Sequence, residues 1–214
     1  MQIEVITFQD WRKLKIPNDQ VIVTVSKSKT WSRGLSPFIL GPCKLYDGNI
    51  SKNMENAWQY SKVYPEFLVN GVVSDAYMDW AKRGWDRQEA HRYPMGKDAR
   101  PLFSLWSGQR YDYVPARKKI YIPLYYKAVR HTEAFKRLQE HYERSKRDNL
   151  DLYLVDFDAY RHKSMGRTYR DVINDPNRKM GHAFVLAMML EIPERLNRAI
   201  TYIAQNKDVI ETKF

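Results

Sequence analysis

Residues 150–157 read LDLYLVDF, and residues 181–191 read GHAFVLAMMLE. The first run is short and rich in Leu, Tyr, Val and Phe, and such a run predicts a strand. The second run is apolar nearly all round, which predicts a helix buried in a hydrophobic core. A strand followed by a buried helix, within a chain that has other elements of both kinds, indicates an α+β fold.

The rest of the chain predicts further elements around these two. Strands are expected at residues 2–8 and 20–26, and the Pro-Asn-Asp turn at 17–19 predicts that they form a hairpin. The β-branched run at 21–25 predicts that the second strand is central. The apolar spacing and capping residues predict helices at 51–64, 74–85, 116–147 with a break at Pro123, 169–173 and 193–206.

These elements predict one compact domain over residues 1–214 that is predominantly helical with a small sheet. Within it we expect N-terminal strands in 1–32, a core in 33–190 and a C-terminal helix in 191–214. Residues 87–115 show no obvious element. A stretch of that length is usually functional or disordered, and its aromatic residues argue against disorder.

Composition excludes several classes of protein. With 43% hydrophobic and 14% aromatic residues, the chain of 214 residues is neither disordered nor of low complexity. The only cysteine, Cys43, excludes a disulfide within the chain and a cysteine zinc site, and fits a reducing cytoplasm. We expect no signal peptide, because no basic segment followed by an apolar run opens the sequence. The longest apolar run, 183–190, is too short to span a membrane.

The positive charge is concentrated in one part of the chain. The net charge is +11, and residues 81–147 hold 17 Lys and Arg against 7 Asp and Glu. Such an excess is typical of proteins that bind a polyanion, a nucleotide or an anionic metabolite. The alternative is a solvated basic surface that binds nothing specific.

Glu55 is the first candidate for a functional carboxylate. The sequence contains no Walker loop, no GxGxxG and no HExxH pattern, so neither a metal nor another cofactor is expected. On a helix, Glu55, Trp58, Gln59 and Lys62 would share one arc. The alternative is an ordinary amphipathic helix whose acidic residue lies near the positive end of the helix dipole.

Two later segments add candidates. Asp156 and Asp158 follow the strand at 150–157, where polar residues often reach a site, although a turn or a helix cap would explain them equally well. Arg178 and Lys179 precede Gly181 and the buried helix. A free helix N-terminus beside two cations would bind a phosphate, and the alternative is an exposed polar turn.

These pieces, in this order, resemble the NADAR family, which is named for its association with NAD and ADP-ribose. The family's start motif resembles residues 34–38 (GLSPF), its "DG" turn resembles 46–48 (YDG), and its E…Q…K helix resembles Glu55, Gln59 and Lys62. The late segment resembles 156–158 together with 179–182 and 186–189. The similarity covers 33–190, and a bacterial or phage-encoded sister family would give the same pattern.

The resemblance implies an N-glycosidase that cleaves a ribosyl compound: an ADP-ribosylated base, a nucleotide or a modified nucleic acid. It implies Glu55 as base or electrostatic stabiliser, with Asp158, or failing that Asp156, facing it across the ribose. Trp85 or Trp106 would stack on the base, and Lys62, Arg178 and Lys179 would hold phosphate. The alternative function is nucleic-acid or nucleotide binding without catalysis, through the basic stretch 81–147.

Overall fold

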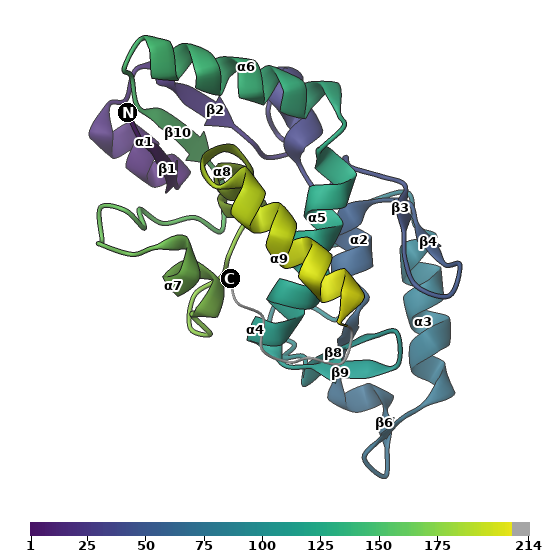
Figure 1. Ribbon diagram of the computed structural model, residues 1–214. Coiled ribbons are helices and arrows are strands. Elements are labelled where there is room, and N and C mark those ends of the chain that lie inside the picture. Colours follow the sequence, from purple (N-terminus) through teal and green to yellow (C-terminus); the bar gives the residue numbers. More distant parts are fainter. Residues whose placement is uncertain (207–214) are drawn as a thin grey trace. The chain divides into compact units, whose positions relative to one another are not determined.

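The computed structural model describes residues 1–206 (Figure 1). The chain forms two compact units. One unit contains residues 1–36 and the chain from Tyr125 onward, and the other contains residues 37–124. Helix α5 (Ile122–Val129) carries the chain from the second unit back into the first. The predicted α+β class, with helices predominating over small sheets, is confirmed. The single domain over 1–214, with divisions at 32 and 190, stays a prediction.

The first unit is built on a parallel three-stranded sheet. Strand β10 (Leu152–Val155) lies between β1 (Ile3–Ile6) and β2 (Val21–Val23), and both neighbours run parallel to it. The predicted hairpin at 2–26 is therefore wrong, and β2 is an edge strand rather than the central one. A helix that was not predicted, α1 (Phe8–Leu14), and the short helix η1 (Asn18–Gln20) lie between the two strands. They connect β1 on one side of β10 to β2 on its other side, so the two strands do not pair with each other.

Five helical segments complete the first unit. Helix α8 is buried along nearly its whole length and contacts β1 and β10, as its apolar sequence predicts. Helix α6 contacts η2, where a Cβ on Gly34 would lie 2.9 Å from that of Ala134. The segments are η2 (Trp31–Leu35), α6 (Glu133–Arg147), α7 (Tyr169–Asn174), α8 (His182–Glu191) and α9 (Pro193–Gln205).

The second unit has short strands around two helices. The helix expected at 51–64 is shorter than predicted, because the chain after Gln59 extends to pair with a strand that was not predicted. The region 87–115 supplies that strand as part of a β-hairpin. The elements are β3 (Cys43–Lys44), β4 (Ile50–Ser51), α2 (Met54–Gln59), β5 (Lys62–Val63), η3 (Pro65–Phe67), β6 (Leu68–Val69), β7 (Val72–Val73), α3 (Asp75–Trp85), β8 (Phe103–Trp106), β9 (Gln109–Tyr111), α4 (Tyr113–Ala116) and η4 (Arg117–Tyr121).

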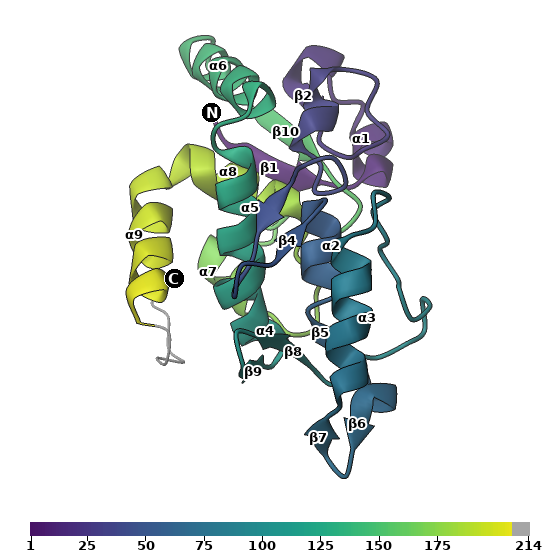
Figure 2. The same cartoon turned by 90° about the vertical axis from the view of Figure 1, so that its right-hand side faces the viewer.

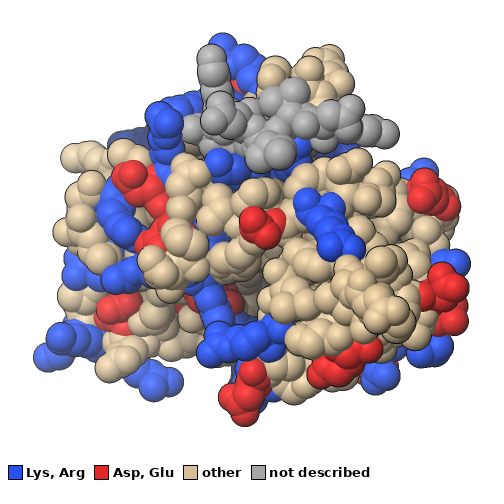
Figure 3. All heavy atoms as spheres, turned by 90° about the horizontal axis from the view of Figure 1, so that it is seen from below, with Lys and Arg blue, Asp and Glu red and all other residues tan. Residues whose placement is uncertain are grey.

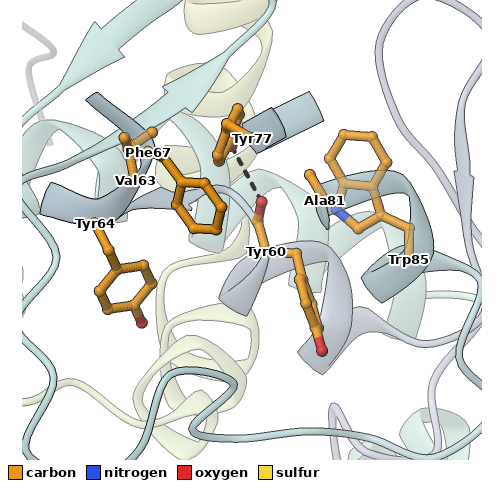
Figure 4. Packing of buried hydrophobic residues seen from close by; sticks show 7 residues of the cluster. All are labelled: Tyr60, Val63, Tyr64, Phe67, Tyr77, Ala81 and Trp85. Carbon is orange, nitrogen blue, oxygen red and sulfur yellow. Dashed lines mark hydrogen bonds between the residues drawn. The ribbon is translucent and has the colours of Figure 1, made fainter. Parts of the chain in front are cut away.

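An aromatic cluster forms the core of the second unit (Figure 4). The Tyr77 hydroxyl donates to the backbone oxygen of Tyr60 at 3.1 Å, which ties α3 to the end of α2. A Cβ on Gly84 would lie 2.0 Å from the Tyr60 ring, so only glycine lets α3 approach this closely. The β6–β7 hairpin extends beyond the N-terminal end of α3 (Figure 2).

Pro123 does not break the helical run in which it lies. The run continues from α4 through η4 into α5, and η4 is a π-helix. A proline ring in an α-helix clashes with the carbonyl four residues earlier, which here is that of Lys119 inside η4. The wider π-turn accommodates the ring, so the predicted break is wrong and the helical run instead ends before Thr132, the cap of α6.

Candidate functional site

Glu55 lies in the first turn of α2 and is 5% exposed. Asn53 caps this helix through its side-chain oxygen, which accepts from the backbone N–H of Asn56 at 2.8 Å. The backbone N–H of Glu55 donates to the Pro37 oxygen at 2.9 Å. This bond and the Asn53 cap together fix the backbone that carries Glu55. The positive end of the helix dipole favours a carboxylate at this position. An ordinary amphipathic helix, the alternative interpretation of Glu55, would place an acidic residue here for the same reason.

The three polar residues predicted to share the arc of α2 do come together. The Gln59 Nε2 donates to Glu55 Oε1 at 2.8 Å, and the Lys62 Nζ donates to Gln59 Oε1 at 2.6 Å. Because an ammonium group can only donate, it fixes the amide of Gln59 with its oxygen toward Lys62 and its nitrogen toward Glu55. We call this chain of contacts the Glu55–Gln59–Lys62 relay.

Aromatic rings lie against the relay. Trp58 is 9% exposed, and its ring packs edge-on against Tyr121 with centroids 5.2 Å apart. The Lys62 Nζ lies 5.0 Å from the centroid of the Trp58 ring, a distance at which a cation is attracted to an aromatic face. An apolar wall lowers the local dielectric and strengthens the electrostatic interactions of a nearby carboxylate.

Asn56, next to Glu55, holds the loop that follows α3. Its Nδ2 donates to the backbone oxygens of Arg87 at 3.1 Å and Glu89 at 3.0 Å, and its Oδ1 accepts from the N–H of His91 at 2.8 Å. Asn56 is fully buried, so these bonds are shielded from water. This asparagine positions the start of the segment 87–115 on the helix that carries Glu55.

The two tryptophans expected to stack on a base are placed differently. Trp85 is 1% exposed and belongs to the aromatic core of the second unit, so its ring faces have no room for a base. Trp106 is half-buried on β8. Tyr46 packs edge-on against both rings, with centroid distances of 5.9 Å to Trp85 and 4.9 Å to Trp106. The structure therefore gives Trp85 a packing role.

In the first unit, Asp156 is the N-terminal anchor of α8. It is 4% exposed, and its Oδ2 lies 3.0 Å from His182 Nδ1 and accepts from the N–H of Ala183 at 3.2 Å. Its Oδ1 accepts from the N–H of Phe157 at 2.6 Å. Asp156 thus accepts from a backbone N–H in the first turn of α8, whose N-cap is Gly181. The N-terminus of α8 already holds this carboxylate, and phosphate binding by Arg178 and Lys179 stays a prediction.

His182 is a residue of this cluster that the sequence analysis did not select. Its Nε2 lies 2.9 Å from the backbone oxygen of Thr24, while Nδ1 faces Asp156. Both nitrogens face acceptors, so the doubly protonated ring satisfies both contacts. Burial raises the pKa of Asp156, but the His182 ring and two backbone N–H groups outweigh burial and hold that pKa below its usual value.

The remaining predicted residues surround this anchor. The backbone oxygen of Asp158 accepts from the N–H of Gly181 at 2.9 Å. The Arg178 guanidinium lies 5.0 Å from the centroid of the Tyr160 ring and 4.0 Å from Asp175, and Lys179 is exposed. Glu55 belongs to the unit 37–124 and both aspartates to the other unit. Their opposition across a ribose stays a prediction.

We expect Gly181→Ala to destabilise the protein by about 3 kcal/mol, the upper end of what overpacking costs. A Cβ at this position would lie 2.2 Å from Asp156 Oδ2 and 2.8 Å from the Asp158 oxygen, so the anchor of α8 would have to move. Urea unfolding followed by circular dichroism measures the change, with the exposed Asn177→Ala as the control. Equal unfolding midpoints for the two variants would contradict the close approach.

No family model matches the chain, and no curated protein sequence matches it. Across residues 1–206, no helix combines the length and apolar character that crossing a membrane requires. In the same residues, His, Cys, Asp and Glu side chains form no group of three that could hold a metal ion.

Proposed function

We propose that the protein is an N-glycosidase that hydrolyses the bond between C1′ of a ribosyl compound and a base nitrogen, with Glu55 as its principal carboxylate. The observation that supports this most directly is the Glu55–Gln59–Lys62 relay, in which a buried carboxylate is held by an amide of fixed orientation. The order of these residues is also one of the pieces that resemble the NADAR family. The residues resembling the family lie in 33–190.

The chemistry of such a reaction suits a buried carboxylate. Water adds its oxygen to C1′, the electron pair of the C1′–N bond leaves with the nitrogen, and that nitrogen takes up a proton. Positive charge develops on the ribose as the bond breaks, and a preorganised carboxylate stabilises it most where water is excluded. Glu55 would stabilise this charge or accept the proton of the attacking water. Of the two aspartates that the resemblance implies as a partner, Asp156 is occupied by His182.

The experiment that tests this proposal is a release assay. The protein is incubated with an ADP-ribosylated base, a nucleotide and a modified oligonucleotide, and free base is quantified by chromatography. We expect release from at least one class of compound by the wild type, and release that is slower by about a hundredfold or more by Glu55→Gln. No release from any of the three, or equal release by the variant, would overturn the proposal.

Nucleic-acid binding through residues 81–147 receives less support. Arg117 is 2% and Lys119 is 8% exposed, so part of the positive charge is not on the surface. The Arg117 guanidinium lies 4.5 Å from the centroid of the Tyr113 ring, and Lys119 lies 5.5 Å from that of Tyr111. On the face drawn in Figure 3, Lys and Arg side chains are interspersed with Asp and Glu.

A further inference from the structure

The loop after β2 combines hydroxyl groups with lysines. Residues 26–32 read SKSKTWS, and both lysines are exposed. The Ser28 hydroxyl lies 3.1 Å from that of Thr30 and 2.9 Å from that of Ser32. The Ser32 hydroxyl donates to the Val23 oxygen at 2.7 Å, which anchors the cluster to the end of β2. These hydrogen bonds thus fix the loop that carries the exposed Lys27 and Lys29.

An exposed aromatic ring lies beside this loop. Phe157 follows β10 and is 48% exposed. The Lys27 Nζ lies 5.9 Å from the centroid of the Phe157 ring, within the range of a cation–π contact. The Phe8 ring, at the start of α1, packs against Phe157 with centroids 5.3 Å apart and planes at 39°.

The three residues each come after a different strand of one parallel sheet. Phe8 follows β1, Lys27 follows β2 and Phe157 follows β10, and all three lie beyond the carboxyl ends of their strands. Ligands of parallel sheets bind at this edge. The neighbouring Asp156 does not repel an anion here, because it is buried and paired with His182.

We propose that this edge of the sheet binds single-stranded nucleic acid, with a base stacked on Phe157 and a backbone phosphate beside Lys27. Aromatic rings next to cations are how proteins hold unpaired bases and their phosphates. A polymer fits better than a single nucleotide, because residues 1–36, which include Lys27, carry six Lys and Arg against three Asp and Glu, and several cations favour a polyanion. All three residues belong to the unit of residues 1–36 and 125 onward, whereas Glu55 belongs to the other unit. Binding of a strand here does not require the proposed hydrolysis.

Fluorescence anisotropy of a labelled 12-nucleotide oligothymidylate tests the proposal with the full chain. At about 50 mM salt we expect binding that weakens steeply by about 200 mM. Phe157→Ala should weaken it about tenfold or more, because each base stacked on an aromatic ring adds that much affinity. Lys27→Gln should flatten the slope of log affinity against log salt by about 0.7, the loss of one phosphate contact.

The matched controls are Tyr202→Ala, which removes another exposed aromatic ring, and Lys44→Gln, which removes another exposed lysine. Both should bind as the wild type does, and so should Glu55→Gln, which separates this proposal from the hydrolase. The proposal fails if the strand does not bind at low salt or if Phe157→Ala and Tyr202→Ala lose affinity equally. It also fails if thymidine monophosphate competes at the concentration of the strand, since the site would then hold a mononucleotide.

Discussion

Asp156→Ala is expected to destabilise the protein by about 3 to 5 kcal/mol, the usual cost of removing one partner from a buried ion pair. The variant leaves His182 without its anion and leaves the N–H groups of Phe157 and Ala183 without their acceptor. Asp156→Asn should cost less. An asparagine amide can donate to an uncharged His182 while its oxygen still accepts from a backbone N–H.

The same pair predicts how stability depends on pH. The folded-state pKa of Asp156 is lowered, so its contribution is complete above the unfolded-state pKa of about 4 and is lost as pH falls through the folded-state pKa. Asp156→Asn should therefore flatten the loss of stability in acid. Glu4, whose pKa is also lowered, keeps part of that loss in the variant.

Urea unfolding at pH 7 and at a series of pH values down to about pH 2, below the unfolded-state pKa, measures both effects by circular dichroism. The control is Asp148→Asn, an exposed aspartate in the same unit, which should match the wild type at each pH value. A loss below about 1 kcal/mol for Asp156→Ala at pH 7 would show that the pair with His182 does not hold α8.

The elements predicted correctly are those whose signal is local. Helices α3, α8 and α9 follow from apolar spacing and from residues such as Pro193 that open a helix. Helix α1 was missed although Thr7 and Asp10 form a capping box that the sequence displays. The β8–β9 turn at Ser107 and Gly108, both with positive φ, was readable in the same way.

The elements predicted wrongly depend on partners far away in the chain. Strand β1 pairs with β10 in the register Ile3 opposite Leu152, and no local pattern predicts parallel pairing over that separation. The length of α2 was overestimated because β5 pairs with β8, where Lys62 lies opposite Ser104. The periodicity of a segment shows which side is apolar, but it does not show which strand will cover it.

The candidate site likewise combines contacts that local spacing in the sequence predicts with contacts between residues distant in the chain. Glu55, Gln59 and Lys62 were predicted together from helical spacing, which holds for Glu55 and Gln59 on α2. Lys62 reaches Gln59 from β5 instead, because the helix ends at Gln59. The pairing of Asp156 with His182 joins residues 26 positions apart across a strand end and a helix start. Gly181 was selected as a binding residue, but its role in packing appears only when Asp156 is placed against it.

Glu55→Gln is expected to lower kcat/KM for base release by about a hundredfold to ten-thousandfold, the range that a positioned acid or base contributes. The glutamine keeps the shape of the side chain, and its oxygen can still accept from Gln59, so the fold should be retained. Thermal unfolding by circular dichroism checks this. Full activity in the folded variant would remove Glu55 from the mechanism.

Lys62→Met separates a positioning role from a structural one. Without the ammonium group, the Gln59 oxygen loses its donor, and the amide is held by its bond to Glu55 alone. We expect kcat/KM for base release to fall by about tenfold, roughly the worth of one hydrogen bond from a charged donor, and therefore less than in Glu55→Gln. Lys62→Arg keeps a charged donor and should restore most of the activity, whereas both variants should unfold at the temperature of the wild type. Equal activity of Lys62→Met and the wild type, or no recovery in Lys62→Arg, would refute a positioning role for Lys62.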